Sequence, residues 1–141
     1  MPTVFVNGCF DLLHAGHVNF LQQARRLAFG HLLVAAVNDD ASARDLKRAK
    51  WGLTYPCDGH KKRLSNVSKY VDVARGFRNE RELRRMVRAY SPCIIAKGPD
   101  YLGKRVVGDD LANVVVVIVN TPEPESVKRL KEQVYRARAS V

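Results

Sequence analysis

Near its amino terminus the chain reads Thr3-Val4-Phe5-Val6-Asn7-Gly8-Cys9-Phe10-Asp11-Leu12-Leu13-His14-Ala15-Gly16-His17. A short β-rich apolar run leads here into a turn with glycine and then into a helical pattern. Four more apolar runs follow the first run, Thr3–Val6, and they are Leu32–Val37, Val71–Ala74, Cys93–Lys97 and Asn113–Val119. Their near-continuous Val, Ile and Leu content is typical of strands that are buried on both faces of a parallel sheet.

Helical periodicity fills most of the intervals between these runs. Apolar residues at spacings of three and four predict three helices, one after the first strand, one before the fourth and one over Ser126–Arg138. The residues are Val18, Leu21, Ala24 and Ala28, then Leu83, Met86, Val87 and Tyr90, then Val127, Leu130 and Val134. Asn79, three residues before Glu82, is a suitable cap for the second helix. Arg48–Lys62 contains two glycines and a proline and is expected to be a long surface loop.

Strands that alternate with helices in this way indicate right-handed βαβ units. The sequence therefore predicts an α/β fold. We expect a Rossmann-like, doubly wound parallel sheet of five strands in a single domain over residues 1–141.

Composition limits the class of protein. The 141 residues are 46% hydrophobic, and 24 Lys and Arg against 14 Asp and Glu give a net charge of +10. No apolar run reaches the ~18 residues of a membrane span, so no membrane partner is expected. No basic leader with an apolar core precedes Thr3, so we expect no signal peptide. Three scattered cysteines argue against a disulfide framework, and a cytoplasmic location is expected.

The basic residues concentrate in residues 44–50, 61–63 and 75–88, whereas residues 1–24 carry only Asp11. Aromatic residues that could stack on bases are not interleaved among these clusters, which disfavours nucleic acid as a partner. Most of the excess charge is therefore expected on solvated helix faces, with a few side chains directed at phosphates.

Ligands of open α/β sheets bind beyond the carboxyl ends of the strands, where residues 8–17, 97–101 and 120–126 are expected. In the first segment, His14 and His17 stand three residues apart where a loop becomes a helix. Both imidazoles can then face one ligand, and Gly16 allows a close approach of the backbone. The helix amino terminus adds free N–H groups that favour phosphate. Imidazoles placed there can donate hydrogen bonds to phosphoryl oxygens in a transition state.

The segment Gly8–His17 resembles the HxGH signature of the cytidylyltransferase-like nucleotidyltransferases. The similarity covers nearly the whole chain and continues through Val37–Asp40, Leu46-Lys47, Tyr70–Asp72 and Lys97–Tyr101. Glycerol-3-phosphate cytidylyltransferase and the heptose-1-phosphate adenylyltransferase domain are the types that it resembles most. The resemblance implies transfer of CMP or AMP from CTP or ATP to a small phosphorylated polyol or sugar, with release of pyrophosphate. It also implies Mg²⁺ bound with the triphosphate rather than in a metal site of the protein, and it leaves a homodimer open.

The resemblance implies roles for individual residues as well. His14 and His17 match histidines that contact the triphosphate and stabilise the transition state, and Lys47 matches a phosphate-binding lysine. These three are the expected catalytic residues. Lys50 and Arg78 match cations that bind the acceptor phosphate. Contacts to the nucleotide are expected from Gly8, Cys9, Phe10, Asp11, Ala15, Gly16, Gly98, Asp100, Thr121 and Ser126. Within this set the backbone of Cys9 and Phe10 would touch the nucleotide, and Asp11 would hold the loop.

The last motif departs from the family pattern, which has a Thr/Ser-rich segment with a glycine at the start of the final helix. Thr121 and Ser126 remain here, but Glu123 and Glu125 replace small residues. Carboxylates in the phosphate pocket would repel a triphosphate, whereas carboxylates in the first helical turn would stabilise the helix. Both outcomes are open, and the alternative function is a catalytically degenerate nucleotide-binding or regulatory module. Lys128 on the final helix is expected to lie outside the site.

Other motifs are weaker. Gly98–Lys104 fits the G-x-x-x-x-G-K pattern of a P-loop, but Arg105 stands where Ser or Thr would bind Mg²⁺. Cys57 and His60 have a metal-like spacing without a second ligand pair. Cys9 lacks a base fixed by sequence, and the absence of G-x-G-x-x-G disfavours a dehydrogenase. The sequence leaves the acceptor, and the choice between CTP and ATP, open.

Overall fold

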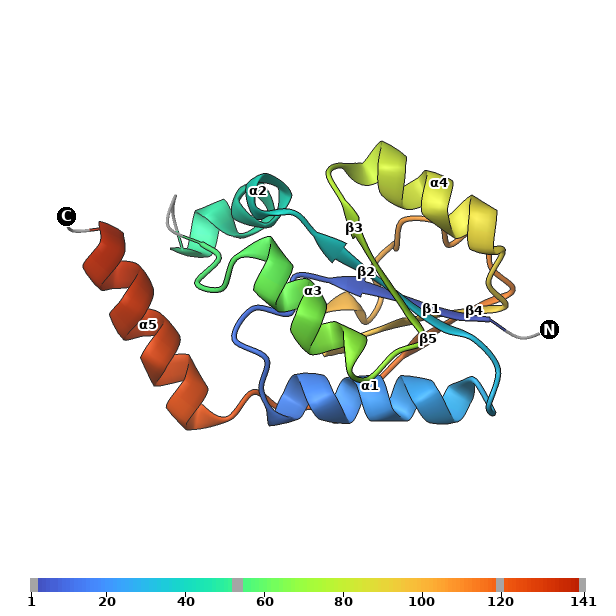
Figure 1. The fold of residues 1–141 in the computed structure, drawn as a ribbon, viewed down its shortest axis with the longest axis horizontal. Helices are drawn as coiled ribbons and strands as arrows, with labels where there is room; N and C mark the ends of the chain where they lie inside the picture. Colours follow the sequence, from blue (N-terminus) through green and yellow to red (C-terminus); the bar gives the residue numbers. More distant parts are fainter. Residues whose placement is uncertain (1–2, 52–54, 119–120, 140–141) are drawn as a thin grey trace.

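The computed structural model describes residues 3–51, 55–118 and 121–139, without the side chains of residues 51 and 134–139. Five parallel strands form one sheet in the order β3-β2-β1-β4-β5 (Figure 1). They are β1 (Val4–Gly8), β2 (Leu33–Asn38), β3 (Val73–Phe77), β4 (Ile94–Lys97) and β5 (Val114–Val117). The predicted α/β class and the five-stranded parallel sheet are confirmed. Val4 of the central strand is in register with Leu33 on one side and with Ile94 on the other.

The third strand differs most from its predicted range, Val71–Ala74, because it begins at Val73. The residue before it, Asp72, has another role. Its carboxylate accepts hydrogen bonds from Leu33 N at 2.8 Å and from the Arg25 guanidinium at 2.7 and 3.1 Å. The chain therefore joins the sheet only after this turn. The predicted end of the fifth strand, Val119, lies outside the described residues.

The three predicted helices are present as α1 (Ala15–Leu27), α4 (Glu80–Tyr90) and α5 (Glu125–Ala139). Asn79 Oδ1 accepts a hydrogen bond from Glu82 N at 2.9 Å, which confirms the expected cap of α4. Leu21 and Ala24 of α1 are buried, as are Leu83 and Val87 of α4. The side chain of Val134, predicted in the apolar stripe of α5, is not described.

The predicted surface loop Arg48–Lys62 is wrong at both of its ends. Helix α2 (Asp40–Trp51) runs into it, and α3 (His60–Ser68) begins inside it. Both helices are strongly polar, because Ala43 is the buried apolar residue of α2 and Val67 that of α3. So few apolar positions leave the periodicity too weak to read from sequence. A short 3₁₀ turn, η2 (Pro99–Tyr101), follows β4.

Helices cover both faces of the sheet. Residues of α1 and α3 pack on the face that carries Val4 and Val6, while α4 packs on the face that carries Phe5 (Figure 1). Helix α5 lies apart from the sheet, near the amino-terminal end of α1. β5 forms one edge of the sheet, where the side chain of Val114 is 52% exposed. Within the described residues no helix is both long and apolar enough to cross a bilayer.

Arg63 of α3 is the largest of the fully buried side chains. Its guanidinium donates to the backbone carbonyls of Asp58 at 3.0 Å, Cys9 at 2.9 Å and Asn38 at 2.8 Å. It also pairs with the Asp40 carboxylate at 2.8 Å. One side chain thus joins the segments that follow β1 and β2 to the starts of α2 and α3. Arg63 is thus an exception to the expectation that most of the excess positive charge lies on solvated helix faces.

Replacing Arg63 with methionine should lower the free energy of unfolding by about 3 kcal/mol or more, because three backbone carbonyls lose their donor and the Asp40 carboxylate loses its partner. Urea unfolding followed by circular dichroism measures the loss. Arg88→Met, at an exposed position of α4, is the matched control and should change stability by about 0.5 kcal/mol at most. Equal effects of the two variants would contradict the bridging role of Arg63.

Candidate active site

A cleft of about 450 Å³ opens at the carboxyl ends of β1 and β4. The chain passes from β1 to β2 on one side of the sheet and later places β4 on the other, so the cleft lies at the switch point of the topology. Most of the residues proposed from sequence line this cleft. They are Gly8, Cys9, Phe10, Asp11, His14, Gly16, His17, Lys47, Lys50, Gly98, Asp100 and Thr121.

The two histidines cap helix α1 reciprocally. His14 is the N-cap residue, and its Nδ1 accepts hydrogen bonds from Gly16 N at 3.0 Å and His17 N at 3.4 Å. His17 Nδ1 accepts in turn from His14 N at 3.4 Å. The rings stack with their centroids 3.7 Å apart. A ring nitrogen that accepts carries no proton, so each neutral imidazole holds its proton on Nε2.

Both imidazoles are held in the neutral form. Burial is the main cause that lowers the pKa of His17, to about 3, and the adjacent His14 adds to it. For His14, burial and the Lys131 ammonium lower the pKa, against the opposing influence of Glu123. At neutral pH the pair therefore offers two Nε2–H donors that need no proton from solvent. Such preorganised donors suit the stabilisation of charge that develops on a bound anion.

Gly16 is required by a close contact between two segments. A Cβ atom at this position would lie 2.6 Å from the Pro122 carbonyl oxygen and 2.9 Å from that of Thr121. Because these neighbours are backbone atoms, neither could move aside at low cost. The sequence assigned Gly16 to a close approach between ligand and backbone, and that stays a prediction. What the structure shows at Gly16 is a close approach of the segment before α5. This contact brings Thr121 to the cleft.

Asp11 holds the loop that follows β1. Its side chain is buried, and its carboxylate accepts hydrogen bonds from the backbone N–H groups of Cys57 and Asp58, both at 2.8 Å. Phe10 and Leu12 on either side have left-handed backbone conformations, with φ of 51° and 47°. Two strained residues thus flank an anchor that ties the loop to the segment before α3.

Positive charge dominates the lining of the cleft. The three acidic residues there are Asp11, Asp100 and Glu123, and the five lysines are Lys47, Lys50, Lys97, Lys128 and Lys131. Lys131 and Tyr55 were not identified from sequence, and Lys97 was given no role of its own within the expected segment 97–101. The expectation that Lys128 lies outside the site is wrong. The spacing of lysines along α5 gave no signal, because the approach of this helix to the cleft depends on the contact at Gly16.

The two glutamates of the last motif have different environments. Glu123 Oε1 is paired with Lys131 Nζ and lies 3.7 Å from His14 Nε2. Burial raises the pKa of Glu123, but Lys131 and His14 outweigh this and lower it overall. Glu125 is exposed and lies 3.8 Å from Lys128 Nζ, in the first turn of α5. The repulsion considered from sequence therefore applies to Glu123 and not to Glu125.

Three residues proposed from sequence are not among the residues that line the cleft. Ala15 and Ser126 are both exposed at the starts of their helices. Arg78 lies before α4, where its guanidinium binds the Glu82 carboxylate through a 2.7 Å contact and two longer ones. The structure thus does not bring Arg78 together with Lys47 and Lys50.

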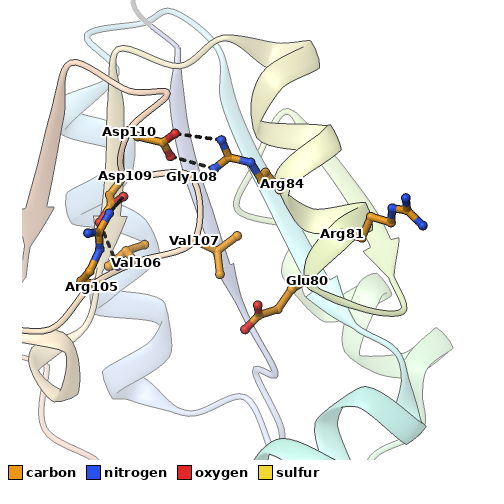
Figure 2. A pocket seen from close by; sticks show the side chains of 9 residues that line it. All are labelled: Glu80, Arg81, Arg84, Arg105, Val106, Val107, Gly108, Asp109 and Asp110. Carbon is orange, nitrogen blue, oxygen red and sulfur yellow. Dashed lines mark hydrogen bonds and ion pairs between the residues drawn. The ribbon is translucent and has the colours of Figure 1, made fainter.

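A second, more open basin of about 620 Å³ lies between α4 and the segment that leads to β5 (Figure 2). Two of its three arginines are paired with neighbouring carboxylates. Arg84 binds Asp110 through two contacts of 2.7 and 2.8 Å, and Arg105 pairs with Asp109 at 3.1 Å. Arg81 points away from the basin in Figure 2. The basin therefore lacks the directed positive charge of the cleft at β1 and β4.

Glu123→Gln should tighten the binding of a nucleoside triphosphate by roughly tenfold. The substitution removes a negative charge near His14 that would repel the triphosphate, and it frees Lys131. Isothermal titration with ATP and with CTP measures the change. Glu125→Gln is the matched control and should leave affinity unaltered, since its side chain is exposed. Equal affinities of the Glu123 variant and the unmodified protein would refute the repulsion.

The depressed pKa of His17 predicts a pH dependence of stability. In the unfolded chain His17 titrates near 6.5, and in the folded chain near 3. Below pH 6.5 the unfolded state binds a proton that the folded state does not, so stability falls as pH decreases towards 3. The slope is about 1.4 kcal/mol per pH unit for this group. Denaturant unfolding at pH 7, 5.5 and 4.5 should show a shallower slope for His17→Asn than for the unmodified protein, and identical slopes would contradict the assignment.

Comparisons with known proteins agree with this geometry. The family model described as cytidylyltransferase-like matches residues 5–122. The chain is 43% identical over 117 residues to the bifunctional protein HldE of Wolinella succinogenes and 46% identical over 109 residues to that of Trichlorobacter lovleyi. These matches cover 82% and 77% of this chain, but only 23% and 21% of the relatives.

Among solved structures, a lipopolysaccharide core biosynthesis protein from Thermoplasma volcanium is 28% identical, with a TM-score of 0.62. The match covers 89% of this chain and 99% of that one. A pantoate-beta-alanine ligase from Francisella tularensis, solved with a form of ATP, shares the fold at 16% identity and a TM-score of 0.56 over 87% of this chain and 60% of that one. On the family model and the HldE relatives, this chain belongs to the cytidylyltransferase-like family.

Proposed function

We propose that this domain transfers a nucleotidyl group, AMP or CMP, from ATP or CTP to the phosphate of a small phosphorylated sugar or polyol, and releases pyrophosphate. The observation that carries the proposal is the pair of neutral imidazoles at the amino terminus of α1, whose Nε2–H donors stand beside a cleft rich in lysine. Two polyanions must meet in this reaction, and positive charge with fixed hydrogen-bond donors lowers the cost of that encounter.

The chemistry follows from this arrangement. An oxygen of the acceptor phosphate forms a bond to the α-phosphorus of the nucleotide, and the bond from that phosphorus to the bridging oxygen breaks. The leaving pyrophosphate takes the electron pair. The acceptor phosphate is already ionised, so no residue has to remove a proton. His14 and His17 donate hydrogen bonds to phosphoryl oxygens, and Lys47 offsets the negative charge that remains.

Mg²⁺ is proposed as the cofactor, bound with the triphosphate. Within the described ranges there is no group of three or more His, Cys, Asp or Glu residues that could hold a metal ion. Oxygen atoms of the triphosphate and water would therefore supply most ligands of the ion, as is common for Mg²⁺ in nucleotide sites. When bound, it neutralises triphosphate charge, and the lysines of the cleft would orient the remaining oxygens.

ATP with a sugar phosphate is the substrate pair to test first. The sequence resembles the heptose-1-phosphate adenylyltransferase domain, and the relatives include HldE proteins and a lipopolysaccharide core biosynthesis protein. CTP with glycerol 3-phosphate is the second pair, from the other type that the sequence resembles. The cytoplasm is the proposed location and nucleic acid is not a proposed partner.

A non-catalytic nucleotide-binding module is the alternative, and the environment of Glu123 favours it. Its carboxylate engages Lys131 and approaches His14, two groups that the reaction would need for phosphate. A chain in which this pairing persists would bind nucleotide weakly and turn over no substrate.

Release of pyrophosphate from ATP or CTP, with a panel of phosphorylated sugars and polyols, tests the proposal. One nucleotide and one acceptor should together give turnover, and that nucleotide should raise the melting temperature on its own. His17→Ala should lower kcat by ~100-fold or more while changing nucleotide affinity far less, because its hydrogen bond is strongest in the transition state. Nucleotide binding without turnover of any acceptor would support the non-catalytic alternative, and an unchanged kcat would remove His17 from the mechanism.

A further inference from the structure

Lys97 is a buried cation at the base of the cleft. It ends β4, only 4% of its surface is exposed, and it lines the cleft between Asn7 at the end of β1 and Tyr101 in η2. The side chain thus crosses from one strand to the other at the switch point of the sheet.

Within the part of the chain that the structure describes, Lys97 Nζ contacts neutral groups. The ammonium donates to Asn7 O at 3.1 Å and to Asn7 Oδ1 at 3.4 Å, and it lies 4.0 Å from the centroid of the Tyr101 ring. An ammonium has three N–H donors, so these two hydrogen bonds leave one without an oxygen acceptor. None of the carboxylates in the described part of the chain forms an ion pair with it.

A buried charge without a counter-ion is costly, and buried cations in proteins are normally paired. Arg63 in the same domain follows that rule, because it is paired with Asp40. Lys97 does not follow it. Burial lowers the pKa of Lys97 to about 8, so most molecules carry the charge at neutral pH. The missing negative charge would be supplied by an anion that enters the cleft.

A purely structural role would not require a charge. A neutral side chain at this position could pack against Tyr101, and the pairing of β1 with β4 already joins the two strands through their backbones. The fold alone therefore does not explain why this residue carries a charge. Lys97 lines the cleft from β4, on the far side of β1 from α2, and at this position its charge can act on an anion in the cleft.

We propose that Lys97 Nζ contacts a phosphoryl oxygen of a substrate at the base of the cleft and is a further catalytic residue of the transfer reaction. This inference rests on the proposed function and extends it. The phosphoryl oxygen belongs either to the α-phosphate of the nucleotide or to the acceptor phosphate. In both cases a negatively charged oxygen lies next to Lys97 Nζ. No bond to Lys97 forms or breaks, and its role is to offset negative charge.

The decisive variants are Lys97→Met, which keeps the length of the side chain but removes its charge, and Lys97→Arg, which keeps the charge. Lys69→Met removes one charge at an exposed position after α3 and is the matched control. Melting temperature is measured for each variant. Titration with ATP and with CTP alone reports on the nucleotide, and KM for the phosphorylated acceptor reports on the acceptor.

Lys97→Met should lower kcat/KM by ~10- to 100-fold, the usual size of a lost charge-assisted hydrogen bond, and Lys97→Arg should recover most of the loss. A weaker nucleotide titration assigns the oxygen to the nucleotide, and a raised acceptor KM alone assigns it to the acceptor. If Lys97→Met keeps kcat/KM within about twofold of the Lys69→Met control, or loses activity only in proportion to its unfolded fraction, the inference is overturned. Failure of the unmodified protein to bind nucleotide or release pyrophosphate would instead overturn the proposed function.

The pH profile provides a second test that does not depend on the stability of the methionine variant. The titratable and charged groups around Lys97 are Cys9 after β1, Lys47 on α2 and Tyr101 in η2. Burial raises the pKa of both the Cys9 thiol and the Tyr101 hydroxyl, so neither titrates near pH 8. For the unmodified protein kcat/KM should fall as pH rises through about 8, and for Lys97→Arg it should stay level. A level profile for the unmodified protein between pH 7 and 9 would refute the contact.

Discussion

The site depends on how the first N–H groups of α1 are satisfied. A helix begins with backbone donors that have no partner inside the helix. Here His14 Nδ1 takes two of them, and His17 Nδ1 takes the N–H of His14. The cap that starts the helix also fixes the orientation of both rings and the position of their protons. The same hydrogen bonds thus serve the fold and the chemistry, and neither ring can turn without leaving a backbone N–H group without its acceptor.

The sequence revealed those features that arise from local pattern. Apolar runs predicted the five strands, and the spacing of His14 and His17 predicted the cleft. Features that arise from long-range contacts were not predictable. Arg63 looks like one more member of a basic cluster, because its four acceptors are distant in the chain or belong to the backbone. The lysines of α5 line the cleft next to the contact between Gly16 and the backbone of Thr121 and Pro122, which are distant from Gly16 in sequence.

The basic residues that give the chain its positive charge have different roles. Arg84 and Arg105 are exposed and paired, and such surface pairs contribute little to stability. Arg63 is buried and donates four hydrogen bonds to other segments of the chain, so it serves the fold. The cleft is lined by five lysines but by only three acidic residues. Net charge alone would suggest a general affinity for anions, whereas burial and pairing separate the cations that hold the chain from those available to a ligand.

The edge strand β5 has a consequence for how copies of the domain behave in solution. Four successive valines, Val114–Val117, form an edge whose outer side has no strand partner among the described residues. Such an edge is a template for pairing with another chain. A net charge of +10 keeps copies apart by mutual repulsion. Because that repulsion is screened beyond ~10 Å at 0.1 M salt, ionic strength would set the colloidal stability of the protein, independently of the free energy of its fold.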